Sequence, residues 1–200
     1  MTAVHPIMYS QYGEQEYILA NTPEIGRFLD IGAWNAKDFS NTRALYERGW
    51  SGVMVEPSPE PFLGLLKEYG NDERITLIQA AFGFERCCMK LHATADAVST
   101  TDEASYEKWK NAAAFQGTFW TPTLTLYDLY NQFGVGGFNF INIDTEGSSV
   151  DVLRAILGTD LRPECICVEH DNRIVEASQA AEAAGYRQVH LNGTNVVYAR

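Results

Sequence analysis

The sequence predicts an α/β fold: a three-layer sandwich around a seven-stranded, mostly parallel sheet that ends in an antiparallel hairpin. Three observations lead to this prediction. Short apolar segments alternate with amphipathic helical segments, as is typical of a parallel sheet. Most of the early apolar segments end in a carboxylate followed by a turn. The dipeptide Asn192-Gly193, which favours a tight hairpin, separates the last two apolar segments.

The composition is that of one globular domain, and we expect residues 1–200 to form a single one. The apolar fraction of 46% is enough for a substantial core. No segment approaches the roughly 20 apolar residues of a membrane helix, and the polar start is unlike a signal peptide. The formal net charge of −11 would repel phosphate backbones and anionic membranes. We therefore expect a cytoplasmic protein that binds neither nucleic acid nor membrane; the oligomeric state is not predicted.

The four cysteines form two close pairs, Cys87 with Cys88 and Cys165 with Cys167. Neither spacing is that of a zinc or redox motif. We expect all four to be buried, reduced thiols.

The first half of the chain is expected to alternate strands and helices. Pro59 directly follows Ser58, a favourable start for a helix, whereas Gly49 and Gly70 are suited to end helices. The expected elements are a helix within 11–20, a strand at 27–31, a helix capped by Ser40 or Asn41 and running to 48, a strand at 52–56, a helix over 58–70, a strand at 75–81 and a short antiparallel extension at 87–92.

Residues 93–122 interrupt this alternation. An insertion of this length is more often a functional lid than a simple connection. Its aromatic residues, including Phe119 and Trp120, either wall a substrate pocket or pack on the domain. The elements expected from here on are a helix over 102–115, a helix from Thr125 to Gly134 with a T-x-x-D capping box, a strand at 138–143, a helix from Ser148 to Leu157, a strand at 165–168, a helix over 172–184, and strands at 186–191 and 196–199.

Acidic residues follow four of the five expected parallel strands. They are Asp30, Glu56, Asp144 with Glu146, and Glu169 with Asp171. Ligands of open α/β sheets bind in the crevice outside the carboxyl ends of the strands, so these acids should share one site. Each acid alone is more often a helix cap or a turn residue. Carboxylates gathered together resist desolvation unless donors or cations are supplied, so the site favours hydroxyls, amines or positive charge.

The sequence of the turn after the first strand indicates which kind of cofactor the site could bind. A dinucleotide site needs G-x-G-x-x-G, whereas this chain has only the first glycine in Gly32-Ala33-Trp34-Asn35-Ala36-Lys37. S-adenosylmethionine carries no phosphate and has a cationic sulfonium, so it suits such a turn and an acidic floor. Glu56, at the end of the second strand, is placed to accept hydrogen bonds from both ribose hydroxyls.

Several segments resemble the FkbM family of S-adenosylmethionine-dependent methyltransferases. FLDIGAWNAKDFSNT is similar to the family's Asp-x-Gly-Ala motif, and GWSGVMVEPSPEPFLGL to its second strand with Glu-Pro. IQAAFG, TPTLTLYDL, FINIDTEGSSVDVLRAI and ICVEH resemble later segments in the family's order. The resemblance covers about residues 10–198 and implies a class I methyltransferase (Rossmann-like) fold.

The resemblance also implies an O-methyltransferase that acts on a hydroxyl of a sugar or small natural product. Asp144 and Glu146 would lie beside the transferred methyl group. Around the cofactor, Asp30, Gly32, Ala33 and Ser40 would surround the methionine part, Glu56 the ribose, and Gln79 with Ala80 the adenine. The residues expected to bind the cofactor are Asp30, Gly32, Ala33, Asn35, Ser40, Glu56, Pro57, Gln79, Ala80 and Asp144.

The chain departs from the family's pattern in the first turn. Asn35-Ala36 stands where the family usually has Asp-Gly, and Trp34 replaces a small polar residue. Because alanine disfavours positive φ, we expect a differently shaped loop and a lower cofactor affinity.

Methyl transfer to an alcohol needs a base for its proton. The candidates are Asp144, Glu146 and His170, although His170 is equally expected to bond a neighbouring loop. Asp144, Glu146, Glu169 and His170 would also suit Mg²⁺ or Mn²⁺, so a divalent metal is possible, but no ligand spacing supports one and none is expected. Two other functions stay open: a nucleoside-binding protein without turnover and, disfavoured by the missing glycines, a nicotinamide oxidoreductase.

Overall fold

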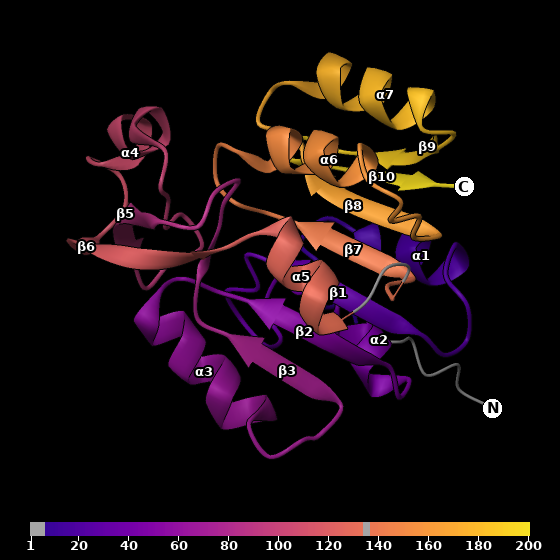
Figure 1. Ribbon diagram of the computed structural model, residues 1–200, viewed down its shortest axis with the longest axis horizontal. Helices are drawn as coiled ribbons and strands as arrows, with labels where there is room; N and C mark the ends of the chain where they lie inside the picture. The colour runs from indigo at the N-terminus through magenta and orange to yellow at the C-terminus, as the bar shows by residue number, and fades with distance from the viewer. Residues whose placement is uncertain (1–6, 134–136) are drawn as a thin grey trace.

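The computed structural model describes residues 7–133 and 137–200, and a twisted seven-stranded sheet lies at its centre (Figure 1). Its strand order is β3-β2-β1-β7-β8-β10-β9. The pairs from β3 to β8 are parallel, and β10 is antiparallel to both of its neighbours. These strands are β1 (Arg27–Ile31), β2 (Ser51–Val55), β3 (Ile75–Ile78), β7 (Phe140–Ile143), β8 (Cys165–Glu169), β9 (Arg187–Leu191) and β10 (Asn195–Ala199). The predicted fold class, including the C-terminal antiparallel hairpin, is confirmed.

Helices cover both faces of this sheet, so the molecule has three layers. In Figure 1, α5, α6 and α7 lie in front of the sheet and α1 and α2 behind it. The helices are α1 (Glu14–Ala20), α2 (Arg43–Glu47), α3 (Pro59–Tyr69), α4 (Glu103–Trp109), α5 (Leu126–Phe133), α6 (Ser149–Leu157) and α7 (Ile174–Ala183).

Two separate apolar cores result from the alternation of side chains along the strands. Leu29 and Ile31 of β1 pack in the core with α5, α6 and α7. Phe28, on the other face, packs in the core with α1, α2 and α3. Asp30 therefore faces the layer of α1–α3, and this places a carboxyl group beneath the carboxyl edge of the sheet.

A second, three-stranded sheet lies beyond the carboxyl ends of the parallel strands, next to α4 (Figure 1). It has the order β4-β6-β5 and consists of β4 (Ala81–Phe82), β5 (Cys88–Thr94) and β6 (Phe115–Leu124). The predicted single strand at 75–81 is wrong, because β3 ends at Ile78 and the chain then crosses to the second sheet. The insertion is also more ordered than expected: β6 pairs with β5 along its length, and α4 connects them.

The helix boundaries follow the sequence signals with small shifts. The predicted Thr125–Asp128 capping box is present, since Asp128 accepts hydrogen bonds from both the N–H and the hydroxyl of Thr125. The helix at 43–47 is capped at Thr42 rather than at Ser40 or Asn41. Ser40 Oγ nevertheless accepts a hydrogen bond from the Arg43 N–H. The predicted end of α5 at Gly134 lies outside the described residues.

The cysteine prediction is half right. Cys165 and Cys167 are buried in β8, but Cys87 and Cys88 are exposed at the start of β5. This exposed pair lies at the small second sheet, whereas the buried pair belongs to a central strand of the large sheet.

Candidate functional site

A cavity of about 660 Å³ opens at the carboxyl edge of the large sheet. The ends of β1, β2, β7 and β8 form its floor, and the segment from Asp96 to Trp109 forms part of its wall. Eight of the residues predicted to act in the site line this cavity: Asp30, Gly32, Ala33, Ser40, Glu56, Asp144, Glu146 and His170. The acidic strand ends are thus brought together as expected.

Four predicted residues do not line it. Pro57 lines a small neighbouring cavity of about 40 Å³. Gln79 and Ala80 line a different cavity, which they share with Arg86 and Asp128. The Asn35 side chain is used within its own turn. A contact from Gln79 or Ala80 to a ligand in the large cavity is therefore not supported by this arrangement.

In the loop after β1, the residues with positive φ are not the one that the sequence comparison singled out, Ala36. Gly32, Trp34 and Phe39 have φ values of 84°, 37° and 58°, whereas Ala36 does not have a positive φ. Asn35 Oδ1 accepts hydrogen bonds from the N–H groups of Lys37 and Asp38 at 2.8 and 3.0 Å, forming a turn of the kind that Asn favours. Alanine at position 36 therefore imposes no strain on this loop.

Gly32 is required by a close approach between two strand ends. A Cβ atom at this position would lie 1.6 Å from the carbonyl oxygen of Asp144. The N–H groups of Gly32 and Ala33 both donate to the carbonyl of Val55. This packing joins the ends of β1, β2 and β7 directly under the cavity.

A buried polar chain crosses the floor. Asp30 pairs with Asn142 across β1 and β7, and Asn142 Nδ2 donates to Asp30 Oδ1 at 2.9 Å. Thr42 Oγ1 donates to the other carboxylate oxygen of Asp30 at 2.6 Å. Asn41 Nδ2 donates to Asn142 Oδ1 at 3.0 Å. Burial raises the pKa of Asp30, and the two donors oppose that shift.

Glu56 is 4% exposed and lies at the cavity end of β2. Its Oε2 accepts a hydrogen bond from the Trp34 N–H at 2.9 Å, and its Oε1 accepts one from the Ser58 N–H at 2.7 Å. Burial raises the pKa of its carboxyl to about 7 despite these donors. Each oxygen keeps a lone pair for another donor, so the carboxylate is able to accept from a ligand.

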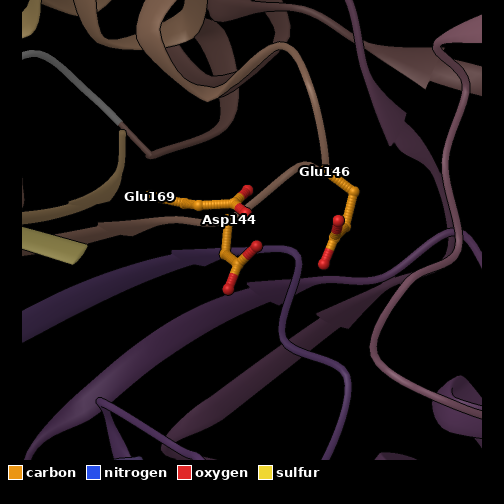
Figure 2. A group of neighbouring side chains, drawn as sticks. All are labelled: Asp144, Glu146 and Glu169. Carbon is orange, nitrogen blue, oxygen red and sulfur yellow. The ribbon is translucent and has the colours of Figure 1, made fainter. Parts of the chain in front are cut away.

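Asp144, Glu146 and Glu169 form an acidic cluster whose ligand oxygens lie within 4.8 Å of one another (Figure 2). Asp144 and Glu146 follow β7, and Glu169 is the last residue of β8. Burial, together with repulsion from Glu169 and Asp171, raises the pKa of Glu146 to about 8. Burial and mutual repulsion also raise the pKa values of Asp144 and Glu169. The cluster therefore holds protons near neutral pH, or would accept a cation in their place.

Asp171 has a structural role beside this cluster. Its two carboxylate oxygens accept hydrogen bonds from the N–H groups of Gly147 and Ser149, at 3.0 and 3.1 Å. These N–H groups belong to the start of α6, where a negative charge is favourable. The predicted cap residue Ser148 has the N-cap position but makes no side-chain capping bond.

His170 has partners on both ring nitrogens. Its Nδ1 accepts a hydrogen bond from the Asn172 N–H at 3.2 Å, and its Nε2 lies 3.3 Å from the Asn192 carbonyl oxygen, to which it donates in this tautomer. The ring is 8% exposed. In this arrangement neither nitrogen is available to take a proton from a substrate, which fits the loop-bonding role and not the base.

The insertion contacts the acidic turn after β7. Thr100 Oγ1 donates to the carbonyl oxygen of Glu146 at 2.6 Å. Gly147 packs so closely on Ser105 that a Cβ atom there would lie 2.4 Å from the Ser105 hydroxyl. Trp109 of the insertion lines the cavity, but Trp120 is 70% exposed and does not, so the predicted aromatic wall is only partly present.

Other residues of the site were not predicted. Asn41 and Asn142 carry the polar chain, and Trp34 donates from its indole nitrogen to the Ala95 carbonyl at 3.0 Å. A polar Asn142 inside the apolar segment FINI was a usable signal, because such a residue must find a buried partner. Nothing local to residues 95–99 indicates that they reach the cavity, since that depends on how the insertion folds back.

The lining of the cavity is strongly acidic. Nine Asp and Glu residues contribute to it, against Lys108 and Arg173 among the Lys and Arg residues that the structure describes. Arg173 already makes two hydrogen bonds with Asp151, at 2.7 and 2.9 Å. Within residues 7–133 and 137–200, no helix has the length and apolar character to cross a membrane.

Comparison with known proteins identifies related sequences and folds. The sequence model of the methyltransferase FkbM domain matches residues 30–189. No curated protein matches the chain in sequence. The methyltransferase domain of METTL16 has a similar fold, with a TM-score of 0.53 at 11% identity over 98% of this chain and 69% of that one.

Weaker structural likenesses are also found. A precorrin-6y C5,15-methyltransferase from Geobacter metallireducens gives a TM-score of 0.49 at 13% identity, covering 100% of this chain and 92% of that one. The Podospora anserina methyltransferase PaMTH1, solved with S-adenosylhomocysteine, gives 0.48 at 12% identity, covering 98% and 90%.

Proposed function

The chain belongs to the FkbM methyltransferase family, and from this premise we propose that it transfers a methyl group from S-adenosylmethionine to a hydroxyl of a sugar or small natural product. The family match supports an S-adenosylmethionine-dependent methyltransferase. The proposed transfer to a hydroxyl is supported mainly by the cavity, which is lined by Glu56 and by the cluster of Asp144, Glu146 and Glu169.

The residues of the cavity fit this cofactor. Its volume lies within the range of about 300–1,000 Å³ that is usual for small-molecule sites. The acidic lining suits a sulfonium and an ammonium group and disfavours a diphosphate. Asp30, Gly32, Ala33 and Ser40 would hold the amino-acid part, and Glu56 the ribose hydroxyls. The adenine is then left to other lining residues, because Gln79 and Ala80 lie elsewhere.

The cofactor, when bound, supplies an electrophilic methyl group. The protein's own task is to align an acceptor oxygen with that group and to remove the acceptor's proton. Glu146 suits the second role because its pKa is about 8. A carboxylate with this pKa is a stronger base than an ordinary surface glutamate. We assign the acceptor's proton to Glu146, whose pKa is raised by burial and by repulsion from Glu169 and Asp171.

The charge of the site supports a neutral or cationic acceptor. Phosphate-bearing molecules, including nucleic acids, would approach nine acidic side chains with Lys108 as the main cation of the wall. Hydroxyl groups, in contrast, are neutral, so they donate hydrogen bonds to carboxylates without electrostatic repulsion. A polyhydroxylated acceptor is therefore favoured over an anionic one.

A divalent cation is a second candidate for the acidic cluster. Three carboxylates within 4.8 Å are of the right chemistry for Mg²⁺ or Mn²⁺. We propose that protons, rather than a metal, neutralise the cluster, and that treatment with a chelator leaves turnover unchanged. A turnover that falls with chelator and returns with Mg²⁺ would reverse this assignment.

Calorimetry followed by a transfer assay tests the proposal. The protein is titrated with S-adenosylmethionine, S-adenosylhomocysteine and NAD, and then supplied with methyl-labelled cofactor and a panel of sugars and other small alcohols. We expect binding of the first two ligands, no binding of NAD, and label transfer to at least one alcohol. Binding of S-adenosylhomocysteine without transfer to any acceptor would favour a nucleoside-binding protein without turnover, and binding of NAD alone would favour an oxidoreductase.

A further inference from the structure

One residue that lines the cavity carries a buried polar atom with no hydrogen-bond partner among the described residues. Asn41 is 7% exposed and lines the cavity, yet its Oδ1 is buried and accepts no hydrogen bond from residues 7–133 or 137–200. Buried amide oxygens are normally paired, so such an atom calls for an explanation. A ligand that donates to it would remove the cost of its desolvation.

The direction of the polar chain fixes which end of the Asn41 amide is left over. The Asp30 carboxylate only accepts hydrogen bonds, so Asn142 presents its nitrogen to Asp30 at 2.9 Å. Asn142 then presents its oxygen to Asn41, which must donate from Nδ2 at 3.0 Å.

The second hydrogen of the Asn41 amide is also used. Asn41 Nδ2 lies 3.6 Å from Cys167 Sγ of β8, a weak acceptor. Both hydrogens of Asn41 Nδ2 are thus used, one by Asn142 and one by Cys167. Asn41 Oδ1 remains as the last acceptor in this series of buried hydrogen bonds. Asp30, through Asn142, orients an amide that it does not touch.

We propose that Asn41 Oδ1 binds the ammonium group at the amino-acid end of the cofactor, and that Asp30 acts as a positioning residue that orients this oxygen through Asn142. The inference rests on the proposed cofactor. A donor is required because the free atom is an acceptor, and a cationic donor is favoured because Asp30 and Asp144 line the same floor. An anionic group at this position would meet an acceptor and two acidic residues.

The test compares two ligands on wild-type protein and on variants. S-adenosylhomocysteine carries the ammonium group; its deaminated analogue keeps the carboxylate and lacks the ammonium. In wild-type protein, we expect the first ligand to bind about tenfold or more tightly, as for a hydrogen bond to a charged group. Asn41→Ala should abolish this preference by weakening S-adenosylhomocysteine and leaving the analogue nearly unchanged.

Two further variants separate binding from folding. Asn41→Leu keeps the volume of the side chain and replaces the alanine variant if that one is unfolded in a thermal melt. Thr42→Val removes the other hydrogen bond to Asp30, and Thr42 does not line the cavity. It should lower the melting temperature while preserving the tenfold preference.

The outcomes distinguish this inference from the proposed function. If wild-type protein binds neither ligand, the cofactor proposal itself is wrong. If it binds S-adenosylhomocysteine but both Asn41 variants retain the preference for the ammonium, or lose both ligands equally, the role of Asn41 is overturned and the cofactor stands.

Discussion

The main chain of Trp34 is bonded to the side chain of Glu56: the Trp34 N–H donates to Glu56 Oε2 at 2.9 Å. This bond connects the loop after β1 to the end of β2. Because Glu56 also accepts from the Ser58 N–H, one buried carboxylate fixes two loops of the cavity. Its charge state therefore matters both to the shape of the site and to what the site binds.

Replacing Glu56 by Gln should weaken S-adenosylhomocysteine binding about tenfold or more, since a hydrogen bond to a charged group is worth about 1.5–3 kcal/mol. In the free protein the pKa of Glu56 is about 7, and ribose hydroxyls bind its ionised form. Wild-type affinity should thus rise as pH increases through 7, and Glu56→Gln should lack this rise. Calorimetry at pH values about one unit below and about one unit above 7 measures both effects. The matched control is Glu60→Gln, an exposed residue of α3; equal losses in both variants would show that the ribose is held elsewhere.

Replacing Gly32 by Ala should destabilise the fold by more than about 3 kcal/mol, through positive-φ strain and overpacking. The new Cβ would lie 1.6 Å from the Asp144 carbonyl oxygen, and the φ of 84° disfavours alanine. Urea unfolding measures the change. Gly64→Ala is the control: it lies within α3 with open space around it, and alanine there should be neutral or stabilising by about 0.4–1 kcal/mol. A Gly32→Ala protein as stable as wild type would contradict the close approach of β1 and β7.

Replacing Glu146 by Gln should reduce the turnover number by about 10²-fold or more while changing cofactor affinity little, because the acceptor's proton then has no base. In wild-type protein the turnover number should rise with pH towards and above 8, as Glu146 loses its proton. Glu103→Gln, at an exposed position of α4, is the control and should keep both the rate and its pH dependence. A Glu146→Gln enzyme with the same pH profile as wild type would place the base elsewhere.

Replacing Glu169 by Gln should stabilise the protein at alkaline pH. Burial and the neighbouring Asp144 and Asp171 raise the pKa of Glu169 in the folded state. A raised pKa means that the folded state holds a proton that the unfolded state releases above its ordinary pKa of about 4.3, so this residue's contribution falls as pH rises. The variant should exceed wild type by about 1–3 kcal/mol near pH 8.5 and differ little near pH 4.

Urea unfolding at both pH values checks this result, with the exposed Glu182→Gln of α7 as control. A wild-type protein that is equally stable at the two pH values, or a Glu169→Gln variant that is less stable at the higher one, would contradict the proposed repulsion.

Much of the large sheet is predictable from the sequence because its strands are short apolar segments ended by turn residues. The floor of the site follows from the same pattern, since Asp30, Glu56 and Asp144 lie next to the ends of parallel strands that meet at one edge. The sequence does not predict the strand Phe115–Leu124, because this segment alternates weakly and contains Gly117 and Pro122, which are disfavoured in strands.

The roles of individual side chains depended on contacts that local sequence does not encode. His170 was a reasonable base by residue type, yet backbone groups from residues 172 and 192 take both ring nitrogens. The local sequence indicates Asn41 only as a helix cap, because its partner Asn142 lies 101 residues away in the chain. Such pairings arise from the strand order, which places β7 beside β1.

The hydroxyl of Thr100 holds the carbonyl of Glu146, and Ser105 packs on the next residue, Gly147. A segment of the cavity wall is therefore in direct contact with the turn that carries Glu146, the residue that we propose as the base. We therefore expect a substitution in residues 100–105 that widens the range of acceptors to displace Glu146 as well, so that acceptor selectivity and turnover change together.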